Sequence, residues 1–270
     1  KSIGISGCCK MNILEKIIAH KKKEVEAQSM IIPIERLKDS QRFFTVRNFR
    51  QALEGDDLKV IAEIKRRSPS SGDIMADADP GVVAKAYEQN GAAAISVLTD
   101  QEFFGGQLEF IQQVKAVTEL PILRKEFIIS KYQVWESFQA GADAILLIAD
   151  AVDEELLTDL YHLAEELGMH VLIETHSTEN LQWIRDLNPP IVGVNCRNLK
   201  SMTTDLDWFE QVVDQFPTDS VKVAESGIHD AHDLDTIYGL GYNAALVGTS
   251  LMKSGNPGTA LAELLKMVSA

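Results

Sequence analysis

The chain has 270 residues, of which 45% are hydrophobic and 24% charged, a balance that excludes a disordered chain, a collagen-like chain and a small disulfide scaffold. It holds 26 Lys and Arg against 40 Asp and Glu, and the net charge of −14 disfavours nonspecific binding to nucleic acid or an anionic membrane. No run of about 18 apolar residues occurs, so we expect no membrane span.

Charge and cysteine are unevenly distributed along the chain. Residues 1–50 carry more basic than acidic side chains, whereas residues 51–270 are strongly acidic. We expect the basic arm to lie against its own acidic body rather than to bind nucleic acid. The three cysteines, Cys8, Cys9 and Cys196, follow no disulfide-scaffold spacing, which indicates a reducing compartment and a cytoplasmic protein.

The N-terminal region divides into two parts. Residues 1–10 lack the long apolar core of a signal peptide, and Met11 resembles a natural start. We therefore expect residues 1–10 to be a tag or annotation remnant. Residues 11–57 are predicted to form a helical extension ahead of the main fold, which begins at residue 58.

The extension begins with a clear helical pattern. Apolar residues recur at helical spacing from Ile13 to Val25, with lysines between them, and Pro33 lies beyond the end of the pattern. This spacing predicts an amphipathic helix. A polar stretch follows, with a short helix expected near residues 46–53.

From residue 58 onward, short apolar runs alternate with longer amphipathic segments. The runs are apolar on both faces, as in residues 144–148, which is typical of buried parallel strands. Eight such units without flexible linkers predict a single (β/α)8 barrel, a TIM barrel, over residues 58–270. An open doubly wound sheet is the alternative. The runs begin near Lys59, Ala93, Pro121, Asp143, His170, Ile191, Val221 and Asn243.

Helix ends support this division. A leucine stripe from residue 156 to 167 has Asp153 as a candidate N-cap and Gly168 just past its end. Gly91, Gly141 and Gly241 each stand between an amphipathic segment and an apolar run, where glycine ends a helix in the left-handed conformation.

Charged and polar residues stand at the ends of the predicted strands, where the active site of a (β/α)8 barrel lies. Glu63 and Lys65 are two residues apart, so their side chains point to the same side of the strand. A single charged strand end is commonly solvated or paired, but a set from many strands predicts an active site. The same spacing relates Lys125 to Phe127 and Asn195 to Arg197, and other strands end in Glu174, Glu225 and Ser226.

Two glycines at the last strand ends indicate an anion site. Gly227 and Gly248 would let main-chain N–H groups face a phosphate near a helix N-terminus. A phosphate site after strands seven and eight is frequent in (β/α)8 barrels, although a plain turn is the alternative.

The strand-end segments together resemble the indole-3-glycerol-phosphate synthase family of tryptophan biosynthesis. The resemblance covers residues 11 to about 265, and the first and third of its segments are specific in combination. It implies a barrel with an N-terminal helical extension over the catalytic face. The matching segments are EIKRRSPS (63–70), ISVLTD (95–100) with FGG (104–106), LRKEFII (123–129), IE (173–174), GVNCRNL (193–199) and AESGI (224–228).

The resemblance also implies a reaction. The substrate 1-(2-carboxyphenylamino)-1-deoxyribulose 5-phosphate closes to indole-3-glycerol phosphate with loss of carbon dioxide and water. Lys125 resembles the general acid at the ketone oxygen, and Lys65 resembles the residue that pairs with the substrate carboxylate and shares acid duty. Glu174 resembles the base for dehydration, and Glu63 and Glu225 resemble supports that orient the lysines.

The remaining site residues follow from the same resemblance. Asn195 is expected to bind a substrate hydroxyl, and Ser226 completes the catalytic set. The resemblance implies no cofactor and no metal, and we expect a monomer or weak homodimer. Ser68, Arg197, Gly227, Gly248 and Thr249 are expected to hold the phosphate, and Phe104, Phe127 and Leu147 to form an apolar slot for the anthranilate ring.

Some residues depart from the pattern or invite other interpretations. Glu126 stands where the family usually has Asp, and one added methylene moves a carboxylate by about 1 Å, a distance that matters in catalysis. Cys196 has no paired base in any motif, so a nucleophilic role is disfavoured. His229 and His232 are expected at the surface rather than in a metal site.

Three other functions remain open from the residues alone. A phosphoribosylanthranilate isomerase would share the phosphate site but would not need two lysines with paired glutamates. A Schiff-base aldolase would use Lys125 as nucleophile. A phospholigand-binding barrel without activity would bind substrate without turnover.

Overall fold

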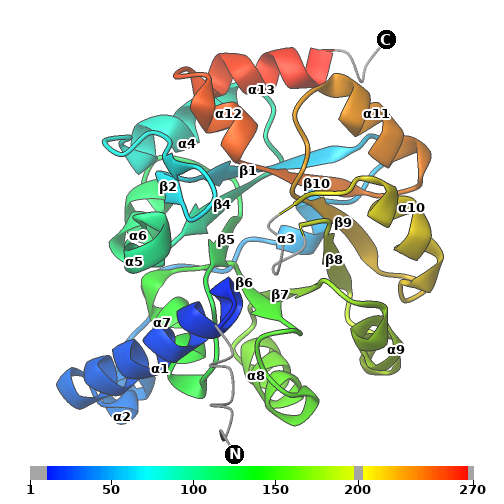
Figure 1. Cartoon of the computed structure of the whole chain (residues 1–270). Helices are drawn as coiled ribbons and strands as arrows, with labels where there is room; N and C mark the ends of the chain where they lie inside the picture. Colours follow the sequence, from blue (N-terminus) through cyan, green and yellow to red (C-terminus); the bar gives the residue numbers. More distant parts are fainter. Residues whose placement is uncertain (1–10, 198–202, 267–270) are drawn as a thin grey trace, which may run out of the picture.

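The computed structural model describes residues 11–197 and 203–266 and has a closed barrel of eight parallel strands at its centre (Figure 1). The strands pair in the order β1-β10-β9-β8-β7-β6-β5-β4, each parallel to its neighbours. Every predicted strand start lies within one residue of the observed start, so the predicted (β/α)8 barrel is confirmed. The strands are β1 (Lys59–Ile64), β4 (Ala94–Leu98), β5 (Ile122–Lys125), β6 (Ala144–Ile148), β7 (His170–Thr175), β8 (Ile191–Asn195), β9 (Val221–Glu225) and β10 (Ala244–Val247).

Helices surround the barrel and follow its strands in turn (Figure 1). They are α4 (Pro80–Gln89), α6 (Glu109–Lys115), α7 (Lys131–Ala140), α8 (Glu154–Glu166), α9 (Thr178–Leu187), α10 (Asp207–Val212), α11 (Ala231–Gly239) and α13 (Pro257–Lys266). Shorter elements lie in the loops: the antiparallel pair β2 (Arg67–Ser68) and β3 (Gly72–Asp73), α5 (Gln101–Phe104), η1 (Val213–Gln215) and α12 (Thr249–Lys253). None of the described helices has the length and apolarity needed to cross a membrane.

The predicted helix ends are confirmed by their cap geometry. The Asp153 side chain accepts a hydrogen bond from the main-chain N–H of Leu156 at the start of α8. Gly91 and Gly141 have φ of 94° and 93° after α4 and α7, where a residue with a side chain would be strained. These caps satisfy main-chain groups that the helix leaves unpaired and so fix where each loop begins.

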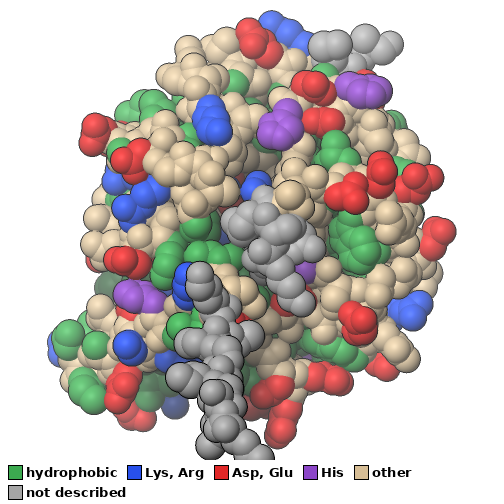
Figure 2. Space-filling model, viewed as in Figure 1, with side chains coloured by type: hydrophobic (Ala, Val, Ile, Leu, Met, Phe, Trp, Pro, Cys, Tyr) green, Lys and Arg blue, Asp and Glu red, His purple; other side chains and the backbone are tan. Residues whose placement is uncertain are grey.

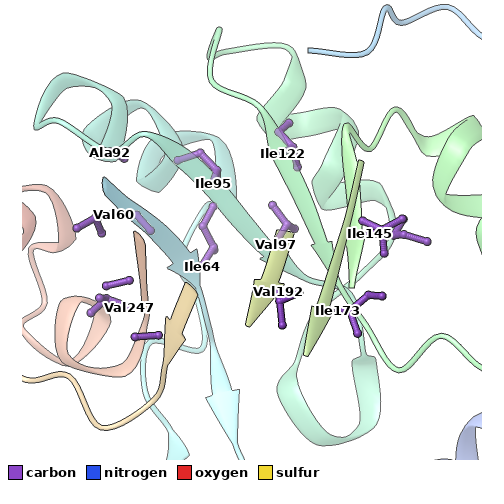
Figure 3. Packing of buried hydrophobic residues seen from close by; sticks show 14 of the residues in the cluster. Val60, Ile64, Ala92, Ile95, Val97, Ile122, Ile145, Ile173, Val192 and Val247 are labelled. Atoms are coloured by element: carbon purple, nitrogen blue, oxygen red, sulfur yellow. The ribbon is translucent and has the colours of Figure 1, made fainter. Parts of the chain in front are cut away.

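Two apolar layers hold the barrel together. The outer layer fills the space between strands and helices, and Figure 3 shows members such as Val60, Ile95 and Ile145 on several strands. The inner layer consists of the strand side chains that point toward the inside of the barrel, and it fills that space. The short helix α3 (Phe49–Ala52) contributes the fully buried Phe49 to this inner layer, which packs the barrel interior with chain from outside the strands.

The first helix, α1 (Ile13–Ile31), is joined to the barrel through a buried ion-pair cluster. The side chain of Lys21 is only 1% exposed, and its Nζ lies 3.0 Å from Asp100 Oδ2 and 3.1 Å from Glu126 Oε1. Glu24, one turn further along α1, accepts a hydrogen bond from the same ammonium at 2.9 Å. Burial alone would lower the pKa of Lys21, but Glu126 and Asp100 outweigh it and raise the pKa above its usual value. The cluster therefore holds a charged lysine inside the protein.

A second cluster ties the segment after α2 (Ile34–Asp39) to the opposite end of the barrel. The carboxylate of Asp143, fully buried just before β6, accepts hydrogen bonds from the main-chain N–H of Arg47 at 2.7 Å and of Ile122 at 2.8 Å. It also pairs with the buried ammonium of Lys115. The N-terminal segment is thus attached to the barrel at two separate places.

Removal of the Lys21 charge is expected to destabilise the protein strongly. In Lys21→Met, the buried carboxylates of Asp100 and Glu126 lose their cation, and breaking a buried pair in this way costs about 3–5 kcal/mol. The free energy of unfolding from urea titration measures the loss. Lys23→Met, at an exposed position of the same helix, is the matched control and should change stability by less than about 0.5 kcal/mol. Equal stability of the two variants would contradict the proposed anchoring role of Lys21.

Candidate active site

A cavity of about 430 Å³ opens at the carboxyl ends of the strands, which is where the sequence places the active site. Residues from α1 form part of its wall, namely Ile13, Leu14 and Ile17. Figure 2 shows this face of the molecule, with Asp and Glu side chains distributed around its periphery. The cavity is lined by Glu63, Lys65, Ser68, Phe104, Lys125, Phe127, Glu174, Asn195, Arg197, Glu225, Ser226, Gly227, Gly248 and Thr249, all of them predicted site residues.

Leu147 is the predicted site residue that the structure places elsewhere. It is fully buried in the outer layer between β6 and the helices. Its neighbours Leu146 and Ile148 line the cavity instead, because successive side chains of a strand point to opposite faces. The assignment of Leu147 to the ring pocket was therefore wrong by one residue.

Lys125 is the centre of the charged cluster in the cavity. It is the last residue of β5, and its Nζ donates a hydrogen bond to Glu174 Oε2 at 2.6 Å and another to Glu225 Oε2. Burial would lower the pKa of Lys125, but Glu174, Glu225 and Glu63 together outweigh burial and raise it above the usual lysine value. The side chain is therefore a charged ammonium.

The two glutamates that hold Lys125 differ in the direction of their pKa shifts. Burial would raise the pKa of Glu174, but Lys125, helped by His176, outweighs burial and lowers it. Burial and the charge of Glu174 raise the pKa of Glu225 well above its usual value. Each carboxylate makes ionisation of the other less favourable, and so the pKa shifts of the two glutamates are opposite in direction.

Glycines on neighbouring strands make room for these carboxylates. A Cβ added to Gly193, on β8, would lie 2.4 Å from Glu225 Oε1. A Cβ added to Gly248, directly after β10, would lie 2.5 Å from Glu63 Oε1. Both separations are far below van der Waals contact, so any side chain here would displace a site carboxylate.

Lys65 and Glu63 form a second pair beside the first. The Lys65 ammonium contacts Glu63 Oε1, and both side chains line the cavity from the end of β1. Glu63 is 1% exposed, while the Lys65 side chain is 18% exposed and so accessible from the cavity. The expectation that these two residues point to the same side is confirmed.

The wall formed after β9 and β10 has the geometry of a tight turn. Ser226 and Gly227 both have positive φ, of 72° and 73°, and positive φ is rare for a serine. A Cβ on Gly227 would lie 2.9 Å from Cys196 Sγ, so only glycine fits. Lys253 of α12 and His229 also line the cavity. The sequence analysis did not identify Lys253, and it expected His229 at the surface, where its side chain is indeed exposed.

The opposite wall is apolar. The rings of Phe104 and Phe127 lie 6.0 Å apart between centroids, with an interplanar angle of 32°. Leu146, Ile148 and the α1 residues Ile13, Leu14 and Ile17 complete this side of the cavity. The cavity thus joins an apolar wall to a charged centre and a glycine-containing turn.

Cys196 and Glu126 have structural contacts. The Cys196 thiol is buried, donates to the main-chain oxygen of Ser226 at 3.3 Å, and has its pKa raised to about 11 by burial. Glu126 accepts a hydrogen bond from Thr99 Oγ1 at 2.7 Å in addition to its pairing with Lys21. A nucleophilic Cys196 is therefore disfavoured, and the longer side chain of Glu126 serves the anchoring of α1.

His176 is a site residue that sequence reasoning missed. Its side chain lines the cavity two residues after Glu174, and Asn195 contacts the same Glu174 carboxylate through a hydrogen bond of 3.2 Å. The alternation that related Glu63 to Lys65 would also have related Glu174 to His176.

Comparisons with known proteins agree with this geometry. A sequence profile described as indole-3-glycerol phosphate synthase matches residues 14–264. A protein of that name from Geobacillus sp. is 42% identical over 261 residues, covering 96% of this chain and 98% of that protein. Another from Streptomyces griseus is 40% identical over 256 residues, covering 94% and 95%.

Solved structures of other proteins share the fold. Orotidine 5'-phosphate decarboxylase from Pyrococcus horikoshii superposes with a TM-score of 0.59 at 12% identity, over 78% of this chain and 99% of that one. Thiamine phosphate pyrophosphorylase from Pyrococcus furiosus gives 0.57 at 16% identity, over 82% and 98%. At these identities the likeness concerns the barrel alone. The profile match and the close relatives, together with the site geometry, show that the chain belongs to the indole-3-glycerol phosphate synthase family.

Proposed function

We propose that different residues of the cavity catalyse the successive steps of the ring closure that this family carries out. The chain is a decarboxylating, ring-closing lyase of tryptophan biosynthesis, and its substrate carries a carboxylate, a ketone and a phosphate. The observation that carries the proposal is the contact of the Lys125 ammonium with Glu174 and Glu225 at the centre of the cavity. The cluster supplies a proton donor and a proton acceptor side by side.

Ring closure needs a proton at the ketone oxygen. The aromatic carbon that bears the carboxylate attacks the ketone carbon, a carbon–carbon bond forms, and the ketone oxygen takes a proton from the Lys125 ammonium. The carboxylate then leaves as carbon dioxide, and its electron pair restores the aromatic ring. A positioned general acid of this kind contributes typically about 10²–10⁴-fold to the rate.

Dehydration needs a second acid and a base. The new hydroxyl leaves as water with a proton from Lys65, whose ammonium contacts Glu63. Glu174, the ionised carboxylate of the cluster, takes the proton lost as the indole forms. Asn195 donates to Glu174 at 3.2 Å and so orients the base. Glu225 and Ser226 complete the wall next to the reacting atoms.

The substrate's two ends match the two walls of the cavity. We assign the anthranilate ring to the slot of Phe104 and Phe127, which offers apolar contact to an aromatic ring. We assign the phosphate to the turns after β9 and β10, where main-chain N–H groups and the Arg197 guanidinium supply donors. The groups assigned to the phosphate are Ser68, Arg197, Gly227, Gly248 and Thr249.

The same chemistry bears on the need for a cofactor and on the alternative reactions. The reaction exchanges protons and eliminates carbon dioxide and water without net redox change, so we propose that the chain needs no cofactor. We further propose that it acts in the cytoplasm as a monomer or weak homodimer. A Schiff-base aldolase is disfavoured, because its nucleophilic lysine must be neutral whereas the pKa of Lys125 is raised.

Lys125→Ala is expected to lower kcat at least about a hundredfold, because the general acid is lost. Lys131→Ala is the matched control, since Lys131 is an exposed residue of α7 paired only with Asp159 among the described residues, and it should keep normal turnover. Steady-state kinetics with the phosphorylated substrate measure both variants, and circular dichroism checks that they fold. Near-normal kcat in a folded Lys125→Ala would remove Lys125 from the mechanism.

Arg197→Gln is expected to raise KM about tenfold or more while kcat changes less than about threefold, since a charge-assisted contact to the phosphate is lost. Arg185→Gln, at an exposed position of α9, is the control and should leave KM unchanged. A large loss of kcat with an unchanged KM would instead place Arg197 in the chemical steps.

A further inference from the structure

His176 lies between two carboxylates at the edge of the catalytic cluster. Its Nδ1 is 3.2 Å from Asp150 Oδ2, and its main-chain N–H donates to the same oxygen at 2.9 Å. Its Nε2 is 3.5 Å from Glu174 Oε1 and has no hydrogen-bond partner within residues 11–197 and 203–266. The imidazole is 11% exposed, so it is held in place while remaining in reach of solvent.

These contacts determine which ring nitrogen carries a hydrogen. An ionised Asp150 can only accept, so Nδ1 of His176 must be the donor in that hydrogen bond. In a neutral ring Nε2 would then present a lone pair to Glu174 Oε1, and neither atom could donate. The contact becomes favourable only when a proton lies between Nε2 and Oε1.

The rest of the cluster decides where that proton resides. The Lys125 ammonium, which outweighs the opposing effect of burial, holds the Glu174 carboxylate in its ionised form. A proton in this contact would therefore reside on His176, as an imidazolium facing two carboxylates. Other charged or titratable groups that line the same cavity are Lys65, Lys253 and Arg197, the carboxyls of Glu63, Glu126 and Glu225, and His229.

We propose that the imidazolium of His176, held by Asp150, positions the Glu174 carboxylate, so that turnover depends on the protonation of His176. The proposal rests on the proposed role of Glu174 as the base. His176 acts through Glu174 and is a positioning residue. Loss of its proton turns an attractive contact into a repulsive one and leaves Glu174 free to move.

The test is the pH dependence of kcat at saturating substrate. In the native chain, kcat should fall about tenfold as the pH rises and His176 loses its proton, because one charge-assisted hydrogen bond is lost. His176→Asn should have the lower kcat throughout the pH series, with no such fall. Asp150→Asn should move the fall to lower pH, because a carboxylate that favours the imidazolium is removed.

Control variants separate this effect from others. His162→Asn, at an exposed position of α8, should keep the native kcat and the native fall. A fall due to His229 or to the substrate phosphate would survive in His176→Asn. Thermal unfolding of His176→Asn should match the native protein, and His176→Gln provides a second neutral replacement if it does not.

The outcomes distinguish the inference from the proposed function. A His176→Asn or His176→Gln variant that keeps the native fall, with or without a general loss of activity, overturns the role of His176. Glu174→Gln should lose turnover, and adding His176→Asn to it should cause no further loss. Turnover retained in Glu174→Gln would refute the role of Glu174 as the base. If Glu174→Gln is inactive but His176→Asn has the kcat and the pH dependence of the native chain, only the role of His176 is refuted.

Discussion

The carboxylates of Glu174 and Glu225 can lie together at the mouth of the barrel because the Lys125 ammonium lies between them. Without that cation, two buried carboxyl groups would both be driven to the neutral form by burial and mutual repulsion. With it, the pKa of Glu174 is lowered, and the pKa values of Glu225 and of the Lys125 ammonium are raised. One electrostatic arrangement thus provides both a proton donor and a proton acceptor, and the surrounding structure maintains their geometry.

The barrel supports this arrangement by bringing together residues that are distant in the sequence. Lys125, Glu174 and Glu225 end three different strands, and their side chains meet because every strand ends at the same face. Glycines at positions 193 and 248 leave the space that the carboxylates occupy. The buried Lys21 then fixes α1 to the barrel next to this face, where α1 supplies part of the apolar wall.

The sequence was sufficient to predict the fold and many of the residues that line the cavity. Apolar runs separated by helix caps located the start of every barrel strand to within one residue, because strand burial and glycine caps leave local signals. The alternation of side chains was harder to use. It paired Glu63 with Lys65 correctly, but Leu147 was assigned to the wrong face of β6, since a strand that is apolar on both sides gives no local sign of which side faces inward.

Contacts between distant segments could not be predicted in the same way. Glu126 differs from the usual family residue by one methylene, and only the structure shows that its carboxylate pairs with Lys21 of α1. The Asp150–His176–Glu174 arrangement likewise depends on the loop after β6 meeting the end of β7. Such contacts have no local sequence signature because they arise from the closure of the barrel.

The central claim is that this cavity closes and decarboxylates its substrate by proton transfer alone. The most direct test mixes the purified chain with 1-(2-carboxyphenylamino)-1-deoxyribulose 5-phosphate, in chelator and without added cofactor, and follows indole fluorescence. The account predicts a rise in fluorescence that continues over many turnovers. Folded protein that binds this substrate tightly but gives no rise would contradict the account and would indicate a binding protein instead.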